Sequence, residues 1–525
     1  MKDESPVHSV NRDRRPVLRL FPWFKLALAG IFLLSLGLRF WRLGQFNTLV
    51  FDEVYYPVFA NRYLLGETVY NTHPPLSQLI LAVGIWLGSH LPFGQEISNT
   101  FTGSLRTTFS YRWLNALTGS FIPITIGAIA YHLTYRRSYG TIAALFAALD
   151  GLFLVESRYG LNNIYLVLFG LLGQLFVLLA LQEYPRSRQR KIRHLRSYQG
   201  SRFRLLRLVS DLVSNFVRDR RPRWQILILA GIFFGLSAGI KWNGLGFLLG
   251  IYLLWLLAWA IAIGQPKNRL ENGKSKQLPI THLTSLNLLH AIWYLGCIPI
   301  FTYCLTWVPH LWLNPKPGFW QMQKEILSFH QKIGSGPEIH PYCSSWYSWL
   351  IMGRPVAYFY QRVRNAEEMI PAYPPLPNGL GEIIYDVHAM GNPLLWWFST
   401  LAIVSLGLLL CLHLWRGKFW RLPLSPSIGL MLFLACNYGA NLLPWLKITR
   451  CTFLYHYMGA SVFAILAGAW IIDNWLHSPQ YLFRYIGIVL IILIIFAFVF
   501  WLPIYLGLPL SPEGYKLRMW FDNWF

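Results

Sequence analysis

The sequence contains few charged residues and very few acidic ones. Of its 525 residues only 13% are charged, while 54% are hydrophobic and 17% are aromatic. Soluble domains carry about 25% charged residues, so the composition excludes an ordinary water-soluble globule. Apolar runs of about 20 residues recur along the chain, and each can cross a hydrocarbon core of roughly 30 Å as a helix. The composition therefore predicts an integral membrane protein.

Cysteine is also scarce, and its spacing indicates no special role. The six cysteines are scattered without a CxxC pair, and Cys297, Cys304, Cys411 and Cys436 lie inside apolar runs. The sequence therefore predicts neither a disulfide framework nor a zinc site.

Eleven apolar runs are long enough to span a membrane, and they predict an all-α polytopic fold. The runs cover residues 24–43, 113–135, 141–156, 165–181, 226–240, 245–263, 289–309, 394–415, 428–446, 453–475 and 485–506. A further stretch, residues 76–91, is short and follows His73-Pro74-Pro75 directly. If it crossed, three basic segments would lie outside, against the positive-inside rule. We therefore expect it to lie in the interface or to re-enter.

The net charge of +24 is concentrated between the apolar runs, with a dense arginine cluster at residues 186–223. This is the positive-inside pattern, and contact with anionic headgroups explains it without nucleic acid. We therefore predict membrane lipids as partners, no nucleic acid, a cytoplasmic N-terminus and an outer C-terminal tail.

These choices divide the chain by side of the membrane. The predicted segments are a cytoplasmic tail (1–23), an N-terminal membrane module (24–309) with a first outer loop (44–111) and a basic cytoplasmic loop (183–224), an outer aromatic loop (310–392), and a C-terminal four-helix module with an outer tail (393–525). Only two of the predicted outer loops are sizeable, the first (44–111) and the fourth (310–392). We expect interfacial helices and the function in these two loops.

Two adjacent carboxylates stand out because the chain has only 22 acidic residues. Asp52 and Glu53 follow the first run in the context Val50-Phe51-Asp52-Glu53-Val54-Tyr55. Partial burial at a membrane surface raises a carboxylate pKa toward neutrality, which suits a general base that accepts a hydroxyl proton. A solvated turn at a helix end explains the same pair, so the pattern leaves both interpretations open.

Several basic residues lie near the outer ends of the runs, where positive-inside bias disfavours them. Arg39, Arg112 and Arg158 require an anion there, either a carboxylate of the acidic pair or a lipid phosphate. Snorkelling to the headgroups is the alternative for each of them.

Further basic residues near the outer helix ends have functional or structural explanations. Pro74 and Pro75 aim His73 where the chain returns to the membrane. Lys447 and Arg450, followed by Tyr455-His456-Tyr457, form a second basic and aromatic patch at an outer helix boundary. Lys241, at an outer turn, is interpreted as an ordinary interfacial anchor.

In order and spacing, these residues resemble those of the protein O-mannosyltransferases. The match begins with Arg39, Phe51-Asp52-Glu53-Val54, His73-Pro74-Pro75-Leu76 and Arg112. It continues with Ala148-Leu149-Asp150-Gly151, Glu156-Ser157-Arg158, residues 239–244, His340-Pro341-Tyr342 with 346–349, and 453–457. The resemblance covers nearly the whole membrane part of the chain.

The resemblance implies an inverting, multi-spanning type C glycosyltransferase that moves mannose from a polyprenyl or dolichyl phosphate to Ser or Thr hydroxyls of secreted or membrane proteins. By the match, Asp52 is the catalytic base and Glu53 helps to hold the acceptor. Arg112, His73 and Arg450 bind the donor phosphate, which leaves without protonation and needs only cations. Arg39, Arg158, His340 and His456 are supporting residues.

Related aminoarabinose transferases carry Lys-Pro-Pro where this chain has His73-Pro74-Pro75, and that lysine approaches the carrier phosphate. Their glutamate metal ligand is replaced here by Thr72, so the resemblance implies no metal, and no cofactor besides the lipid-linked substrate. Asn163 stands where the family commonly has an aspartate, which leaves the role of that position open. The second large outer loop lacks the soluble repeats of eukaryotic members, which implies a bacterial plasma membrane with the active site on its outer face.

Two alternatives remain. A polytopic transporter or flippase is also basic and aromatic, but it would place ionisable residues near the midplane between repeats. A transferase of the same architecture with a lipid or glycan acceptor is separated only weakly by the sequence.

Overall fold

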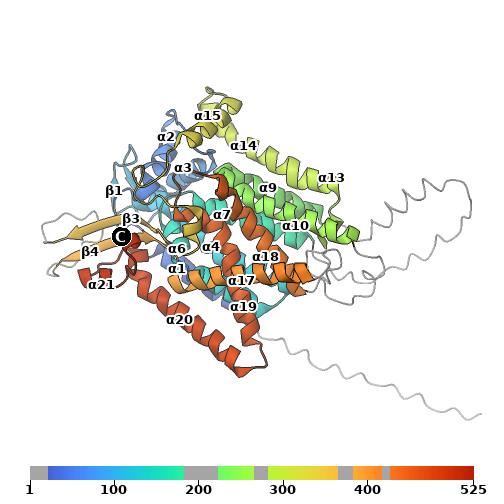
Figure 1. Cartoon of the computed structure of the whole chain (residues 1–525). Helices are drawn as coiled ribbons and strands as arrows, with labels where there is room; N and C mark the ends of the chain where they lie inside the picture. Colours follow the sequence, from blue (N-terminus) through green and yellow to red (C-terminus); the bar gives the residue numbers. More distant parts are fainter. Residues whose placement is uncertain (1–21, 182–222, 265–281, 365–381, 417–425) are drawn as a thin grey trace, which may run out of the picture.

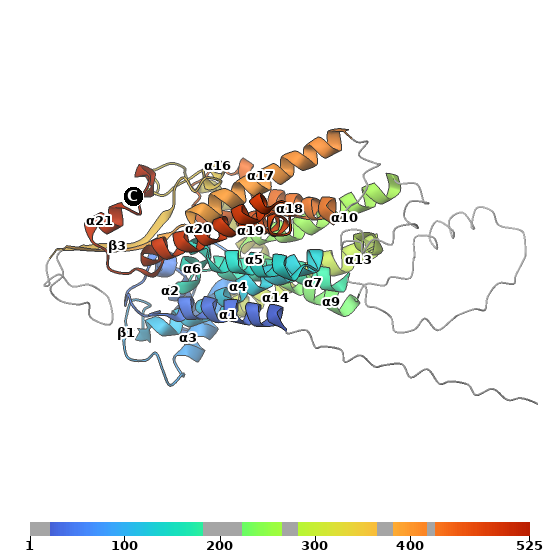
Figure 2. The ribbon, with the colours of Figure 1, turned by 90° about the horizontal axis from the view of Figure 1, so that it is seen from below.

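The computed structural model describes residues 22–181, 223–264, 282–364, 382–416 and 426–525. In these residues most helices run side by side in one bundle, while the strands, several short helices and the C-terminus gather at one end (Figure 1, Figure 2). We call this the strand end. The predicted cytoplasmic tail and most of the basic loop 183–224 lie outside the described residues.

Each of the eleven predicted runs is helical. The bundle comprises α1 (Trp23–Phe40), α4 (Thr108–Thr134), α5 (Arg137–Ala148), α6 (Gly151–Arg158), α7 (Asn163–Ala180), α9 (Trp224–Ile240), α10 (Leu245–Gly264), α13 (Leu288–His290), η4 (Ala291–Cys297), α14 (Ile298–Leu313), α17 (Pro393–Arg416), α18 (Pro426–Leu442), α19 (Met458–Leu476) and α20 (Tyr481–Leu506). Among the described residues, nine helical segments are long and apolar enough to cross a membrane, or ten with the bent pair α5 and α6. The remaining run, α9, has 17 residues. The chain is thus a multi-pass membrane protein.

Helices α5 and α6 meet at a bend of 57°. Helix α5 ends at Ala148, and Asp150 caps α6 by accepting a hydrogen bond from the backbone N–H of Phe153 at 2.9 Å. A carboxylate in this position satisfies an N–H that lacks an intrahelical partner, so a new helix begins in a new direction.

The close packing of α4 against α5 depends on two facing glycines. A Cβ built on Gly127 would lie 2.7 Å from the carbonyl oxygen of Gly140, and one on Gly140 would lie 2.9 Å from that of Gly127. Small residues allow membrane helices to approach this closely. The contact holds α5 and α6 against the helix that carries Arg112.

The strand end contains elements that the helical prediction did not include. Strand β1 (Ser98–Asn99) pairs with β2 (Arg106–Thr107), and β3 (Val356–Val363) pairs antiparallel with β4 (Ile383–Ala389). Strand β3 is rich in β-branched and aromatic residues, which favour strands, whereas the aromatic content of this loop predicts interfacial helices. The all-α class holds for the membrane part, and the loops add two small sheets.

The short helices of this end are η1 (Phe51–Val54), α2 (Tyr56–Leu65), α3 (Leu76–Gly88), η2 (Trp242–Gly244), α15 (Phe319–Lys332), α16 (Trp346–Trp349), η6 (Leu443–Lys447), η7 (Leu454–Tyr457), α21 (Pro512–Lys516) and η8 (Asp522–Trp524). Helix α3 corresponds to the ambiguous stretch 76–91 and has 13 residues. At about 1.5 Å per residue it is roughly 20 Å long, which is too short to cross a bilayer core.

Candidate active site

The two adjacent carboxylates lie in η1, between α1 and α2. Phe51, the residue before them, has a φ of +52°, an uncommon conformation for a residue with a Cβ. Its ring stacks on that of Tyr358 in β3, with ring centroids 4.3 Å apart and planes within 7°. The β3–β4 hairpin therefore supports the turn that carries Asp52 and Glu53.

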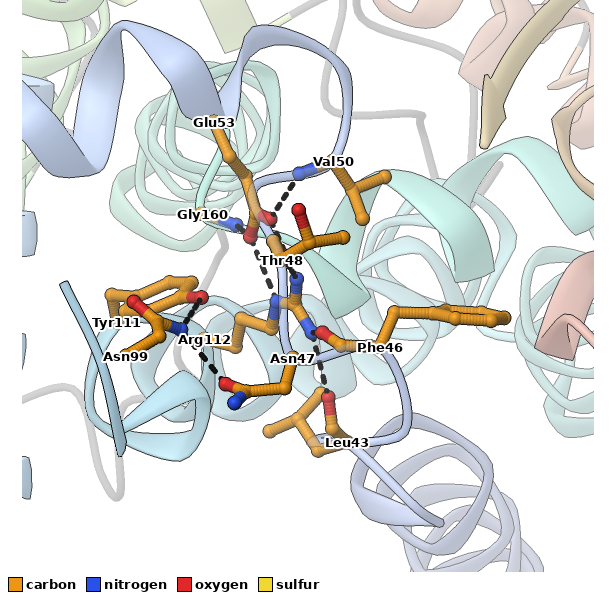
Figure 3. A network of polar contacts seen from close by, with 10 residues as sticks. All are labelled: Leu43, Phe46, Asn47, Thr48, Val50, Glu53, Asn99, Tyr111, Arg112 and Gly160. Carbon is orange, nitrogen blue, oxygen red and sulfur yellow. Dashed lines mark hydrogen bonds and ion pairs between the residues drawn. The ribbon is translucent and has the colours of Figure 1, made fainter. Parts of the chain in front are cut away.

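Glu53 forms a buried ion pair with Arg112 of α4 (Figure 3). The Nε of Arg112 donates to Oε1 of Glu53 at 2.9 Å, and Nη2 donates to Oε2 at 2.7 Å. The remaining N–H groups donate to the backbone carbonyl oxygens of Leu43, Phe46 and Thr48. A guanidinium has five N–H donors, so Arg112 has none left for another ligand.

The Glu53 carboxylate is equally occupied. Besides Arg112, its Oε1 accepts a hydrogen bond from the backbone N–H of Gly160 at 2.7 Å, and its Oε2 accepts one from that of Val50 at 2.8 Å. The structure thus engages Arg112 and Glu53 with each other and with the backbone, whereas the sequence predicts a phosphate contact for Arg112 and an acceptor contact for Glu53. The pair instead ties α4 and the segment between α6 and α7 to the turn that presents Asp52.

Asp52 has a different environment from its neighbour. Its side chain is only partly exposed, and among the described residues no donor forms a hydrogen bond with its carboxylate. Burial raises the pKa of Asp52 from 3.8 to about 6, and the positive charge of Lys241 opposes this rise. A carboxylate that is unengaged and has a pKa near neutrality is suited to accept a proton from a hydroxyl.

Lys241, between α9 and η2, belongs to this site, and its interpretation as an interfacial anchor was wrong. It is 4% exposed, and its Nζ donates to Oδ1 of Asn163 at 3.0 Å. Nζ also lies 6.0 Å from the ring centroid of Tyr56 and 5.5 Å from that of Tyr455. The turn folds into the protein and not toward the headgroups, which the local sequence does not reveal.

A buried hydrogen-bonded chain leads from Lys241 to the β3–β4 hairpin. The Nδ2 of Asn163 lies 3.3 and 3.2 Å from the two carboxylate oxygens of Glu156, and the Tyr358 hydroxyl donates to Oε1 of Glu156. Asn163 therefore accepts from an ammonium and donates to a carboxylate. An amide can do both, whereas an ionised carboxylate can only accept, which gives this position a role that the sequence left open.

A group of basic side chains lies beside the unengaged carboxylate, and we call it the basic cluster. It consists of His73, Lys241, His330, Arg450 and His456. The ring of His330 on α15 lies 4.9 Å from that of His73. Burial, followed by the neighbouring cations of the cluster, lowers the pKa of His73 well below its usual value. The structure thus brings three predicted residues together and adds Lys241 and His330.

An apolar groove adjoins the basic cluster. It has a volume of about 480 Å³ and is bounded by α3, α4, α9 and α14. The groove is lined by Leu76, Leu79, Ile80, Val83, Leu114, Leu236, Thr302, Leu305, Thr306 and Pro309. Leu76 follows His73-Pro74-Pro75 directly, and a Cβ on Gly239, two residues before Lys241, would contact Leu76 and Thr306. One end of the groove therefore lies at the basic cluster.

Arg39 and Arg158, predicted as supporting residues, lie in a separate buried region. Nη1 of Arg158 donates to the carbonyl oxygens of Leu38, Arg39 and Trp41 at 2.9, 3.2 and 2.7 Å. Arg39 interacts electrostatically with Asp150, the cap of α6. A cation at a helix C-terminus satisfies carbonyls that lack intrahelical partners. These residues fix the end of α1, from which the turn with the carboxylates departs.

A disulfide lies close in sequence to both His340 and Arg450. The ring of His340 lies 4.9 Å from that of Phe453, and Cys343, three residues further on, forms a disulfide with Cys451 next to Arg450. The prediction that no cysteine forms a disulfide was therefore wrong. The two partners are separated by 108 residues, and a pairing over such a distance cannot be deduced from spacing.

Two family models match this chain. The model described as "Dolichyl-phosphate-mannose-protein mannosyltransferase" matches residues 29–195. The model described as "C-terminal four TMM region of protein-O-mannosyltransferase" matches residues 316–524.

Curated relatives from bacteria match over most of their length. The polyprenol-phosphate-mannose–protein mannosyltransferase of Corynebacterium glutamicum is 24% identical over 86% of this chain and 81% of the relative. The protein of the same name from Mycolicibacterium smegmatis is 25% identical over 98% of this chain and 95% of the relative. The structure of the S. cerevisiae protein O-mannosyltransferase Pmt1–Pmt2 complex bound to the sugar donor has the same fold, with a TM-score of 0.72, 14% identity, and 96% and 93% of the two chains covered.

The fold and the matched models define a multi-spanning membrane glycosyltransferase. The transporter alternative is therefore set aside. The chain belongs to the protein O-mannosyltransferase family.

Proposed function

We propose that this protein transfers mannose, with inversion, from a polyprenyl-phosphate carrier to Ser or Thr hydroxyls of secreted or membrane proteins. The observation that carries the proposal is the unengaged Asp52 carboxylate beside a basic cluster, which in turn adjoins an apolar groove. The relatives are named as polyprenol-phosphate-mannose–protein mannosyltransferases, which supports this donor and favours a protein over a lipid or glycan acceptor.

The donor is held by two chemically different surfaces. Its polyprenyl chain lies in the groove, where the lining is almost wholly apolar. Its phosphate lies at the basic cluster, where His73 and Arg450 are ligands, and His340 and His456 support the surrounding segments through ring contacts with Phe453 and Trp445. Arg112 and Glu53 act by positioning the turn and not by touching substrate.

In the transfer step the acceptor hydroxyl oxygen attacks C1 of mannose and its proton passes to Asp52. The bond between C1 and the phosphate oxygen breaks, and its electron pair remains on the phosphate. A phosphate is a good leaving group without protonation, so one base and a set of cations suffice. We further propose that the transfer needs no metal ion and no other cofactor.

The proposal places the strand end on the outer face of a bacterial plasma membrane. A disulfide at this end suits an oxidising compartment. The N-terminal end of α1 and the helix ends beside the predicted basic loops lie at the opposite end of the bundle, which suits a cytoplasmic N-terminus (Figure 2).

The direct test is transfer of radiolabelled mannose from polyprenyl-phosphate mannose to a Ser/Thr-rich peptide by the purified protein in detergent. Labelled peptide that loses its label on β-elimination would support the proposal. Label found only in lipid or glycan would transfer the proposal to the second type of acceptor, and no label in any fraction would contradict it.

Filling the groove should weaken donor binding. Val83 lines the groove and is 53% exposed, so we expect Val83→Trp to occupy part of the groove without disturbing the core. Displacing about two methylene groups of the carrier, at roughly 0.8 kcal/mol each, corresponds to about a tenfold higher KM for the donor. Leu87→Trp, one turn further along α3 and outside the groove lining, is the control. Equal KM values in both variants would argue against a carrier in this groove.

Removing the disulfide should loosen the region that carries Arg450. Loss of a native disulfide typically costs about 2–4 kcal/mol, so we expect Cys343→Ser to lower the thermal midpoint in detergent. We also expect a higher KM for the donor, because Cys451 adjoins Arg450. Cys436→Ser, which alters a free cysteine, is the matched control. A Cys343→Ser variant with the midpoint and KM of the control would show that the bridge does not support the site.

A further inference from the structure

Lys241 lies between the two places at which charge changes in the proposed transfer. On one side it interacts electrostatically with the carboxylates of Asp52 and Glu156, and on the other with Arg450 and His73. Its hydrogen-bond partner, Asn163, is neutral, and among the described residues no carboxylate lies within ion-pair distance of its ammonium. A buried cation with a neutral partner is free to interact with either side.

The reaction moves one negative charge through this region. Asp52 begins as a carboxylate and becomes neutral when it accepts the hydroxyl proton. The phosphate begins as a diester with one negative charge and becomes a monoester that carries one more. A single positive charge between the two groups therefore has an anionic partner both before and after the transfer.

The histidines of the basic cluster cannot supply this charge at neutral pH. Burial, followed by the neighbouring cations, lowers the pKa of His330 to about 4, and the pKa of His73 is lowered for the same reasons. The pKa of His456 is lowered by the same causes, so all three rings are neutral near pH 7 and offer hydrogen bonds only. The cations of the cluster near pH 7 are Lys241, whose pKa burial lowers from 10.5 to about 8, and Arg450, and Lys241 is the one beside Asp52.

We propose that Lys241 is a catalytic residue whose ammonium stabilises the Asp52 carboxylate before transfer and the leaving phosphate during it. The chain Tyr358, Glu156 and Asn163 holds Lys241 in this place. The inference rests on the proposed function and adds a residue that the sequence had suggested to be an anchor.

The assignment explains why the network extends to the β3–β4 hairpin. Tyr358 stacks on Phe51, which precedes Asp52, and also donates a hydrogen bond to Glu156. The same tyrosine therefore fixes both the base and, through Glu156 and Asn163, the cation. One aromatic side chain thus contacts both the residue before Asp52 and the network that holds Lys241.

The test compares the pH dependence of kcat for Lys241→Met, Lys241→Arg and the wild type. The groups that face Asp52 are Lys241, Glu156, Tyr56, Tyr358 and Tyr455. Lys241 is the one that lowers the pKa of Asp52, so its removal should move the acidic limb to higher pH by about 1 unit. Loss of the cation from the leaving phosphate should also lower the plateau kcat by about 100-fold. Lys241→Arg should keep the position of the limb.

Lys516→Met, at an exposed lysine of α21, is the matched control and should match the wild type. An unmoved acidic limb in Lys241→Met would overturn the interaction with Asp52. A moved limb with a wild-type plateau would overturn the interaction with the phosphate.

If Lys241→Met does not fold, Asn163→Ala provides a second test. This variant removes only the hydrogen-bond partner of the ammonium, so it should lower kcat about tenfold and shift the acidic limb in the same direction by a smaller amount. A wild-type profile for Asn163→Ala would then overturn the inference.

The inference and the proposed function fail in different ways. If the wild type transfers no mannose to peptide, the proposed function fails before any variant is compared. If the wild type transfers mannose and Lys241→Met does so with the same pH profile and rate, only the role of Lys241 fails.

Discussion

Replacing Asp52 by asparagine is expected to lower the kcat of mannose transfer by about 100- to 10,000-fold, the range for loss of a general base. Thermal stability and donor KM should stay at wild-type values. The substitution keeps the side-chain volume, and the Asp52 carboxylate forms no hydrogen bond with the described residues that an amide would break. Initial rates with saturating donor and peptide, measured beside the thermal midpoint in detergent, check this result.

The same assignment predicts an acidic limb in the pH profile of the wild type. Only the ionised carboxylate accepts a proton, so kcat should fall as the pH decreases through about 6, the raised pKa of Asp52. Above that pH the rate should level off until another group titrates. Asp522→Asn, at an exposed aspartate near the C-terminus, is the control and should leave the profile unchanged. A substantially active Asp52→Asn variant would exclude this residue as the base.

Replacing Arg112 by methionine is expected to destabilise the whole protein. The change leaves the buried Glu53 carboxylate without a counter-ion and removes the donors to Leu43, Phe46 and Thr48. Breaking a buried ion pair from one side costs about 3–5 kcal/mol. We expect a much lower thermal midpoint, poor recovery of monodisperse protein, and loss of transfer as a consequence.

A double variant separates this positioning role from phosphate binding. Arg112→Met together with Glu53→Leu removes both charges, so it should regain part of the midpoint that the single variant loses. If Arg112 instead contacted the donor phosphate, Arg112→Met would keep a wild-type midpoint and raise only the donor KM. That result would restore the role expected from the sequence.

The membrane part of the fold could be predicted from the sequence because its signal is local. A run such as residues 226–240 is apolar on all sides, and a segment of that kind is stable in a bilayer only as a helix. The acidic pair was also recognisable, since two adjacent carboxylates among aromatic residues are costly at a membrane surface. Neither inference required knowledge of which distant residues meet.

The partners of individual side chains could not be predicted in this way. Asp52 and Glu53 are adjacent, yet the turn directs Glu53 to Arg112 and leaves Asp52 unengaged. In the sequence, Lys241 has the context of an interfacial lysine. In the fold, Glu156 of α6 and Asn163 of α7 lie close to it. Such environments depend on contacts between segments far apart in the chain, as does the bridge between Cys343 and Cys451.

The position of Arg450 has a consequence for the biogenesis of the protein. Asp52 follows the first helix of the bundle, whereas Arg450 and Cys451 come before its last two described helices, α19 and α20. During synthesis the bridge to Cys343 can close only after α17 and α18 have been inserted. An incompletely inserted chain thus already has the proposed base but lacks part of the proposed phosphate site, so by this proposal chains that stall early are unable to consume the carrier lipid.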